Sequence, residues 1–178
     1  PGVLRHTVDR LPTLAAKACS LDIPAICIFP YTNSALKTED CAEAWNPDNL
    51  SNRAIKAIKA AVPDIMVMTD IALDPYNIYG HDGIVRGGEI INDETVDALV
   101  KMGEAQAQVG ADILGPSDMM DGRIAALRAM LEQKGFQNVN ILSYSAKYAS
   151  GFYSPFRDAV GATGTFTGDK NTYQMDPA

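Results

Sequence analysis

Residues 92–114 read NDETVDALVKMGEAQAQVGADIL, a helical pattern that leads directly into a short apolar segment. Asn92 is a favourable N-cap, and the two residues after it are acidic, which suits the positive end of the helix dipole. Apolar side chains then recur on one stripe, and Gly110 marks the end of the pattern. The stretch therefore predicts an α-helix followed at once by a short buried strand.

The same alternation extends to both sides of this stretch. Strands alternating with helices form right-handed βαβ units around a parallel sheet, so the predicted fold class is α/β. About four strands fit either an open sheet or part of a TIM (β/α)8 barrel, since a complete barrel needs about 250 residues. Apolar segments too short for a helix lie at residues 25–29, 65–69, 111–114 and 139–143, and segments with helical spacing lie at residues 7–21, 50–61, 92–110 and 122–135.

Length and composition narrow the possible functions. The chain has 178 residues, enough for about one domain, and 47% of them are apolar. Its formal net charge of -7 disfavours a nucleic-acid partner, and no apolar run approaches the ~20 residues of a membrane span. Three cysteines without a C-x-x-C pair disfavour a disulfide framework and a zinc knuckle. A soluble protein of the reducing cytoplasm fits these features best.

Polar residues follow three of the predicted strands directly. In parallel α/β folds the loops at the carboxyl ends of the strands form the active site, so these side chains are expected to converge on one face. They are Asp70, Asp74 and Asp82 after the second strand, Ser117, Asp118, Asp121 and Arg123 after the third, and Ser145 and Lys147 after the fourth.

Lys147 lies among small and aromatic residues in the segment SYSAKYAS, residues 143–150. Partial burial at a strand end would disfavour its charged form and lower its pKa, as a Schiff-base nucleophile requires. The alternative is an ordinary lysine whose ammonium group reaches solvent.

The acidic loop after the second strand also has two interpretations. Asp70, Asp74, His81 and Asp82 suggest a metal site or a carboxylate pair that handles an amine and its protons. The same loop contains proline and glycine, so its acids also suit ordinary turns.

Residues downstream of Lys147 extend the candidate site. Groups that would hold a carboxylate, or else form ordinary solvated surface, are Arg157, Lys170 and Gln174. Aromatic side chains that would wall a small-molecule pocket, or else pack in the core, are Phe152, Tyr153 and Phe156.

Six motifs in order cover essentially the whole chain. They are DIALDPY at 70–76, GHDG at 80–83, GADILGPSDMMDGRI at 110–124, SYSAKYAS at 143–150, PFRDA at 155–159 and YQMDPA at 173–178. Together they resemble the porphobilinogen synthase family, also called 5-aminolevulinate dehydratase. The resemblance implies a TIM barrel. It also implies a lyase of tetrapyrrole (heme) biosynthesis, which condenses two 5-aminolevulinate molecules to porphobilinogen and releases two waters.

The resemblance also assigns roles position by position. Lys147 matches the Schiff-base lysine for the second substrate, whose amino group stays free in the product. Asp74 and Asp82 are expected to act with it at the amine end of that substrate. The expected substrate contacts are Ser117 at the same end, Arg157, Lys170 and Gln174 at the carboxylate, and Phe152, Tyr153 and Phe156 in the pocket wall.

Zinc-dependent members of the family carry three cysteines at positions matched here by Ala72, Asp74 and Asp82. One apolar residue and two carboxylates replace the soft thiolates that select zinc, so no catalytic zinc is expected. For this aspartate-type sequence, the resemblance implies magnesium or a monovalent cation at a site outside this chain, or no metal at all.

Compared with the family, residues 1–178 are expected to form one partial barrel domain. The N-terminal arm, the C-terminal barrel segments and a second Schiff-base lysine in a V-K-P motif are expected to be missing. We therefore expect no turnover by these residues alone, whereas the complete enzyme is expected to be a homo-octamer. Two other functions stay open, namely another class I Schiff-base aldolase barrel and a non-catalytic binding or assembly fragment.

Overall fold

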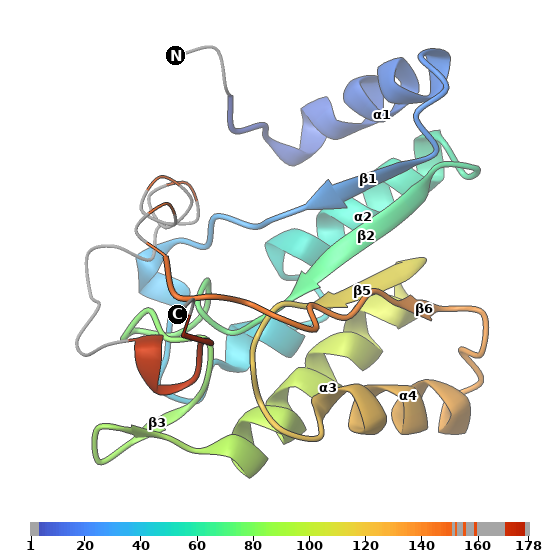
Figure 1. The fold of residues 1–178 in the computed structure, drawn as a ribbon. Helices are drawn as coiled ribbons and strands as arrows, with labels where there is room; N and C mark the ends of the chain where they lie inside the picture. Colours follow the sequence, from blue (N-terminus) through green and yellow to red (C-terminus); the bar gives the residue numbers. More distant parts are fainter. Residues whose placement is uncertain (1–3, 151, 153–154, 156–158, 160–169, 177–178) are drawn as a thin grey trace.

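A four-stranded parallel sheet of order β1-β2-β5-β6 forms the centre of the structure (Figure 1). The structure is a computed structural model that describes residues 4–150, 152, 155, 159 and 170–176. The predicted α/β class is confirmed, and all four predicted strands are present with bounds shifted by a few residues. The strands are β1 (Ala25–Ile28), β2 (Met66–Ile71), β5 (Ile113–Pro116) and β6 (Asn140–Ile141).

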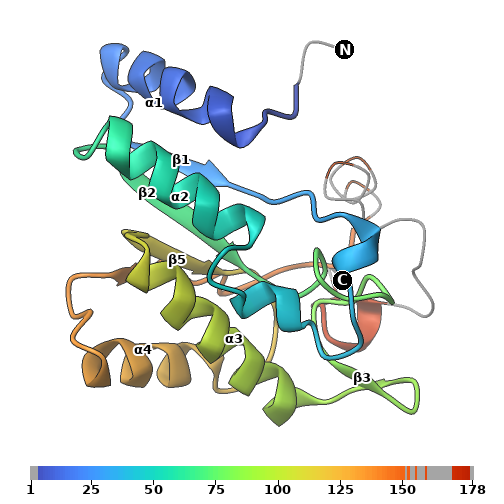
Figure 2. The ribbon, with the colours of Figure 1, turned by 180° about the vertical axis from the view of Figure 1, so that it is seen from behind.

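The helices occupy the segments between the strands, as the periodicity predicts. They are α1 (Leu11–Ser20), α2 (Leu50–Ala61), α3 (Asn92–Gln108) and α4 (Arg123–Gln133). Seen from behind, α2 and α3 lie in front of the strands and α4 packs beside α3 (Figure 2). Ile55, Leu99, Leu114 and Leu127 are completely buried in the core between these helices and the sheet. Burial of this apolar face stabilises the arrangement.

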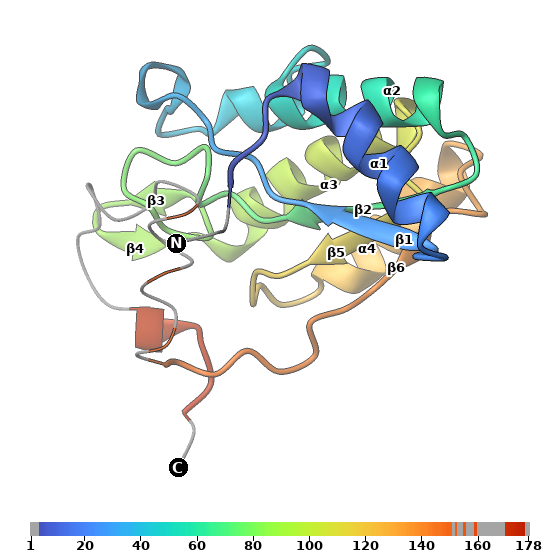
Figure 3. The same ribbon diagram turned by 90° about the horizontal axis from the view of Figure 1, so that it is seen from above.

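The register of the strands decides which residues lie on the other face of the sheet. Met68 lies opposite Cys27 on one side and Ile113 on the other, and Asp70 lies opposite Gly115. Successive side chains of a strand point to opposite faces, so all five residues share one face of the sheet. Leu114, the neighbour of Ile113, packs against Gly103 of α3, so the shared face is turned away from α3, and α2 lies on the same side of the strands as α3 (Figure 3). An acidic group therefore sits at the carboxyl end of an otherwise apolar sheet face.

The start of α3 differs from the prediction that Asn92 is its N-cap. Ile91 occupies the cap position, and the Asn92 side chain instead pairs with the loop that follows β5. The Asp121 backbone N–H donates to Asn92 Oδ1 at 2.8 Å, and Asn92 Nδ2 donates to the Asp121 carbonyl at 3.2 Å. Two hydrogen bonds to a distant loop thus replace the single bond of a cap.

Among the described residues, a short hairpin and three of the 3-10 helices were not predicted, whereas the first 3-10 helix lies within the segment 7–21 that was predicted to be helical. Strands β3 (Val85–Arg86) and β4 (Glu89–Ile90) pair in antiparallel fashion around Gly87 and Gly88, whose positive φ angles suit the tight turn. The 3-10 helices are η1 (Val8–Arg10), η2 (Ser34–Leu36), η3 (Ala42–Trp45) and η5 (Lys170–Thr172). In the part of the chain that the structure describes, no helix is long and apolar enough to cross a membrane.

Candidate active site

Three charged side chains meet beyond the carboxyl ends of the strands. Lys147 Nζ lies 2.9 Å from Asp82 Oδ2, and Lys170 Nζ lies 2.6 Å from Asp82 Oδ1. The Asp82 side chain is 1% exposed, and the two lysine side chains are 11% and 10% exposed. A single buried carboxylate thus holds two ammonium groups, one on each oxygen. Neither lysine is the solvated surface group that the sequence left open.

The backbone brings the two lysines together from separate segments. Lys147 follows β6, and its Nζ also donates to the backbone carbonyl of Ser117, just after β5, at 2.7 Å. The Met175 N–H donates to the Lys147 carbonyl and the Ala149 N–H donates to the Met175 carbonyl, both at 2.9 Å. This short parallel bridge holds the residues that follow η5, which begins at Lys170, beside the segment after β6 that carries Lys147.

The loop that carries Asp82 is held by a buried asparagine. Asn77 Nδ2 donates to the Gly83 carbonyl at 2.8 Å, and Asn77 Oδ1 accepts from the Tyr79 N–H at 2.6 Å. The backbone folds tightly around these bonds, and Gly80 has a φ of +69°, a region that favours glycine. Satisfied buried amides make loop geometry specific. This turn therefore fixes the position of Asp82 beside the two lysines.

The environment of Lys147 corrects the prediction that its pKa is lowered. Burial alone acts in that direction, but the charges of Asp82 and Asp74, together with the hydrogen bond to Asp82, raise the pKa above its ordinary value. The expected decrease reflects desolvation alone, whereas nearby opposite charge stabilises the ammonium form. Lys147 is thus held as a cation until a ligand or a proton transfer changes its surroundings.

The carboxylates around Lys147 are not equivalent. Burial raises the pKa of Asp74 to about 6 and that of Asp70 to about 7, and the charge of a neighbouring aspartate adds to the rise in each case. Burial would also raise the pKa of Asp82, but Lys147 and Lys170 together hold it below its ordinary value. Asp82 is therefore a permanent counter-ion, while Asp70 and Asp74 exchange protons near neutral pH.

Two supporting residues were not given roles from the sequence. Lys37, in the loop after β1, is buried, and its positive charge offsets part of the rise in the pKa of Asp74. Arg123 donates to the carbonyls of Met120 at 2.9 Å and Tyr144 at 3.0 Å, and pairs with Asp118 at 3.2 Å. Lys37 lies in the loop after a predicted strand, so the expectation that loops at the carboxyl ends of the strands form the active site could have identified it.

The remaining predicted contacts divide into three groups. Ser117 and Gln174 are buried near the cluster that Asp82 forms with the two lysines. Ser117 contacts Lys147 through its backbone carbonyl. The side chain of Phe152 is 95% exposed, so the described residues do not place it in a pocket wall. Its role stays a prediction. Residues outside the described part of the chain are Tyr153, Phe156 and Arg157.

The positions matching the zinc cysteines do not fit a zinc ion. Ala72 offers no donor atom, and both oxygens of Asp82 are bound by lysine ammonium groups. Within residues 4–150 and 170–176, no group of three or more histidine, cysteine, aspartate or glutamate side chains is arranged to hold a metal ion. Tetrahedral zinc needs three or four such ligands.

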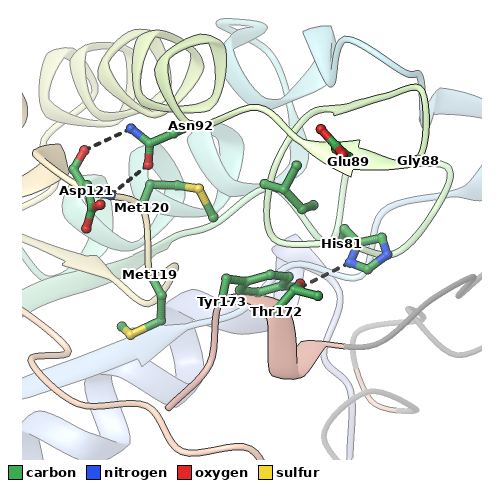
Figure 4. A pocket seen from close by; sticks show the side chains of 10 residues that line it. His81, Gly88, Glu89, Asn92, Met119, Met120, Asp121, Thr172 and Tyr173 are labelled. Carbon is green, nitrogen blue, oxygen red and sulfur yellow. Dashed lines mark hydrogen bonds between the residues drawn. The ribbon is translucent and has the colours of Figure 1, made fainter.

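A cavity of about 670 Å³ adjoins the cluster (Figure 4). His81 and Tyr173 line it on the side next to Asp82, and Met119 and Met120 lie across from them. The Asn92 and Asp121 pair closes the far end. The cavity lies next to Asp82, and its lining includes neither lysine of the cluster.

Comparisons with known proteins agree along the whole chain. The family model described as "Delta-aminolevulinic acid dehydratase" matches residues 1–178. Proteins of that name from Rhodobacter capsulatus and Bradyrhizobium diazoefficiens are 58% and 53% identical over 100% of this chain. A crystal structure of delta-aminolevulinic acid dehydratase (porphobilinogen synthase) from Toxoplasma gondii ME49, in complex with the reaction product porphobilinogen, superimposes on 99% of this chain with a TM-score of 0.96 and 46% identity.

The matches cover the relatives only in part. The chain spans about half the length of the curated relatives, 54% of the Rhodobacter protein and 50% of the Bradyrhizobium protein. It likewise covers 51% of the Toxoplasma chain. The four-stranded sheet described above corresponds to a part of that larger barrel fold.

Proposed function

The chain belongs to the delta-aminolevulinic acid dehydratase family, and we propose that it carries the Lys147 half of a porphobilinogen-forming active site. The whole protein condenses two 5-aminolevulinate molecules to porphobilinogen with loss of two waters. Lys147 binds one of these molecules as a Schiff base. Asp74 and Asp82 act at the amine end, and Lys170, Gln174 and Arg157 bind the carboxylate.

One observation carries the proposal. The amine of Lys147 is buried at the carboxyl edge of a parallel sheet, between the carboxylate of Asp82 and the carbonyl of Ser117. Active sites of parallel α/β folds form at this edge. A lysine that served only solubility would not be buried against a carboxylate with an exposed fraction of 1%. The arrangement supports a reactive amine whose charge is controlled by its neighbours.

The chemistry begins with a proton transfer, because only the neutral amine attacks a carbonyl. Asp74 and Asp70, with pKa values raised to about 6 and about 7, are suited to accept the proton of Lys147. The nitrogen then bonds to the ketone carbon of 5-aminolevulinate to give a carbinolamine. The same carboxylic acid returns its proton to the departing hydroxyl group, so one water leaves and a protonated imine remains. Asp82 stabilises that cation as it stabilised the ammonium.

The carboxylate of the substrate requires a separate cationic site. Lys170 carries an ammonium group that donates to Asp82 at 2.6 Å, and Gln174 lies buried on the same turn. A substrate carboxylate bound at Lys170 would direct the ketone group of the same substrate toward Lys147, since both lysines contact Asp82. The two lysines thus have different tasks, one covalent and one electrostatic.

The proposal extends to cofactor, assembly and location. The site uses no zinc, since its residues do not fit that ion, and a magnesium or monovalent ion belongs outside this chain. The complete enzyme is a homo-oligomer, in the family's case an octamer. All three cysteines are free thiols, which suits the cytoplasm, and subcellular fractionation tests that location.

Reductive trapping tests the proposed function. The chain is incubated with 5-aminolevulinate, reduced with borohydride and measured by intact mass spectrometry. We expect one adduct with the mass of the substrate, less one water and plus two hydrogens. The adduct should vanish in Lys147→Ala and persist in Lys134→Ala, a control lysine paired with Glu104 on the helical side. Absence of any adduct in the wild-type chain would overturn the proposal.

A further inference from the structure

The hydroxyl group of Tyr173 contacts the loop that carries Asp82. Tyr173 Oη lies 3.2 Å from His81 Nδ1 and accepts a hydrogen bond from the Asp82 backbone N–H at 3.4 Å. The two rings meet edge to face with centroids 6.0 Å apart. These contacts join positions more than 90 residues apart in the chain.

Tyr173 also belongs to the turn that carries the second lysine. Its backbone N–H donates to the Lys170 carbonyl at 3.1 Å, and the backbone N–H of Gln174 donates to the same carbonyl at 2.9 Å. One residue is therefore attached to both partners of the Lys170–Asp82 ion pair, through its backbone on one side and its hydroxyl on the other. Neither the proposed chemistry nor the carboxylate site has a role for this hydroxyl.

From this geometry we infer that Tyr173, acting with His81, is a positioning residue that sets the Asp82 carboxylate between Lys147 and Lys170. The inference rests on the proposed function, because its consequence is read on the reactivity of Lys147. Tyr173 touches no reacting atom. It fixes the backbone of Asp82, and Asp82 in turn fixes the position and charge of the nucleophilic amine.

The place of the pair beside the cavity supports this role. His81 and Tyr173 line the 670 Å³ cavity (Figure 4), and the Tyr173 hydroxyl also contacts the Asp82 backbone. Without their contact, the Asp82 backbone would lose its link to the η5 turn on the side where the cavity leaves room to move. An aromatic pair is well suited to hold such a wall, because it combines packing with a directed hydrogen bond.

The test is the pH dependence of reductive trapping with 5-aminolevulinate, compared between the wild-type chain and Tyr173→Phe. The rate rises with pH as the carboxylates that accept the Lys147 proton become ionised, and the groups that face the amine are Asp82, Asp74, Asp70, Asp118 and Lys170. Loss of the hydroxyl loosens the hold of Asp82 on Lys147. We expect the profile to move to lower pH by about half a unit, with a plateau rate several-fold lower.

Tyr79→Phe is the matched control. It removes a tyrosine hydroxyl from the same loop, one that donates to Glu39 at 2.8 Å and does not contact Asp82. Its pH profile should coincide with that of the wild type. Because His81 holds the same hydroxyl, His81→Leu should repeat the shift of Tyr173→Phe. His81→Asn, whose amide reaches the place of Nδ1, should restore the wild-type profile.

The outcomes separate the inference from the function on which it rests. An unshifted profile in a folded Tyr173→Phe chain would overturn the positioning role, and so would a lower yield of adduct without a shift. If Tyr173→Phe fails to fold, equal profiles for His81→Leu and His81→Asn would overturn it instead. Absence of an adduct in the wild-type chain contradicts the proposed function itself.

Discussion

Lys147 and Asp82 are 65 residues apart in the sequence, yet their charged groups lie 2.9 Å apart in a site where the carboxylate is 1% exposed. The pair keeps the amine charged in the resting protein, against the effect of burial. In the proposed chemistry this amine needs a nearby base, and Asp74 and Asp70, with pKa values raised to about 6 and about 7, are the groups proposed for that role. The reactivity of Lys147 is therefore a property of the whole cluster.

Asp82→Asn is expected to make Lys147 easier to deprotonate. The substitution removes the carboxylate that favours the ammonium form, so the pKa of Lys147 falls and the trapping profile moves to lower pH. It also leaves two buried lysines without their counter-ion, which should lower the free energy of unfolding by about 3 kcal/mol. Denaturant titration measures this loss. Asp48→Asn, which breaks an exposed ion pair with Lys56, should stay within about 0.5 kcal/mol of the wild type.

Asp70→Asn should stabilise the protein in a pH-dependent way. Because burial raises the pKa of Asp70 in the folded state to about 7, folding favours its neutral form. The wild type loses this stability as pH rises from about 4, where the unfolded carboxyl titrates, to about 7, whereas the amide does not titrate. The variant should therefore gain on the order of 4 kcal/mol over the wild type at pH 8 relative to pH 4. If the difference in the free energy of unfolding between variant and wild type is the same at pH 4 and pH 8, the burial of this carboxyl group is contradicted.

Arg123→Lys should loosen the segment between β6 and Lys147. Lysine keeps the charge but cannot reach the Met120 and Tyr144 carbonyls and Asp118 at once. We expect a loss of about 2 kcal/mol in the free energy of unfolding and faster hydrogen exchange after β6. Arg53→Lys, on the exposed side of α2, should change neither quantity. Unchanged exchange in Arg123→Lys would show that the guanidinium does not brace this segment.

Gly103→Ala should destabilise the packing of α3. A β-carbon at this position would lie 2.8 Å from Leu127 Cδ2, closer than real β-carbon contacts, and 3.2 Å from Leu114 Cδ1, tighter than most of them. Overpacking of this kind costs about 1–3 kcal/mol, measurable by thermal or denaturant unfolding. Adding Leu127→Val should recover part of the loss, because it removes the atom that clashes. A fully additive double variant would argue against direct contact.

The helices and strands could be predicted from local sequence, because an element buried on one side repeats its apolar residues with a period that can be counted. The strand-end rule likewise brought Asp74, Asp82 and Lys147 to one face without any coordinates. It did not give the direction of the Lys147 pKa shift, since that depends on carboxylates from another loop at distances that spacing cannot supply. Asn92 was assigned wrongly for a similar reason, because its hydrogen-bond partner Asp121 lies 29 residues away.

The hairpin β3–β4 and the η5 turn show a second limit of sequence reasoning. Strands of two residues have too few side chains to display a period, so β3 and β4 were not predicted. Lys170 and Gln174 were predicted as carboxylate-binding residues, from their polar character and from the family resemblance, but their burial was not predicted. Their burial depends on the backbone bridge between Tyr148 and Met175, a contact with no local signature.

The most direct test of the central claim is to locate the borohydride-reduced 5-aminolevulinate adduct by peptide mass spectrometry. Lys147 and Lys170 share the same carboxylate and differ in proposed role, so the measurement discriminates between two buried amines of one cluster. We predict the adduct on Lys147 alone. Lys170→Gln should raise the 5-aminolevulinate concentration needed for half-maximal labelling but leave Lys147 as the modified residue. An adduct on Lys170, or one that survives Lys147→Ala, would contradict it.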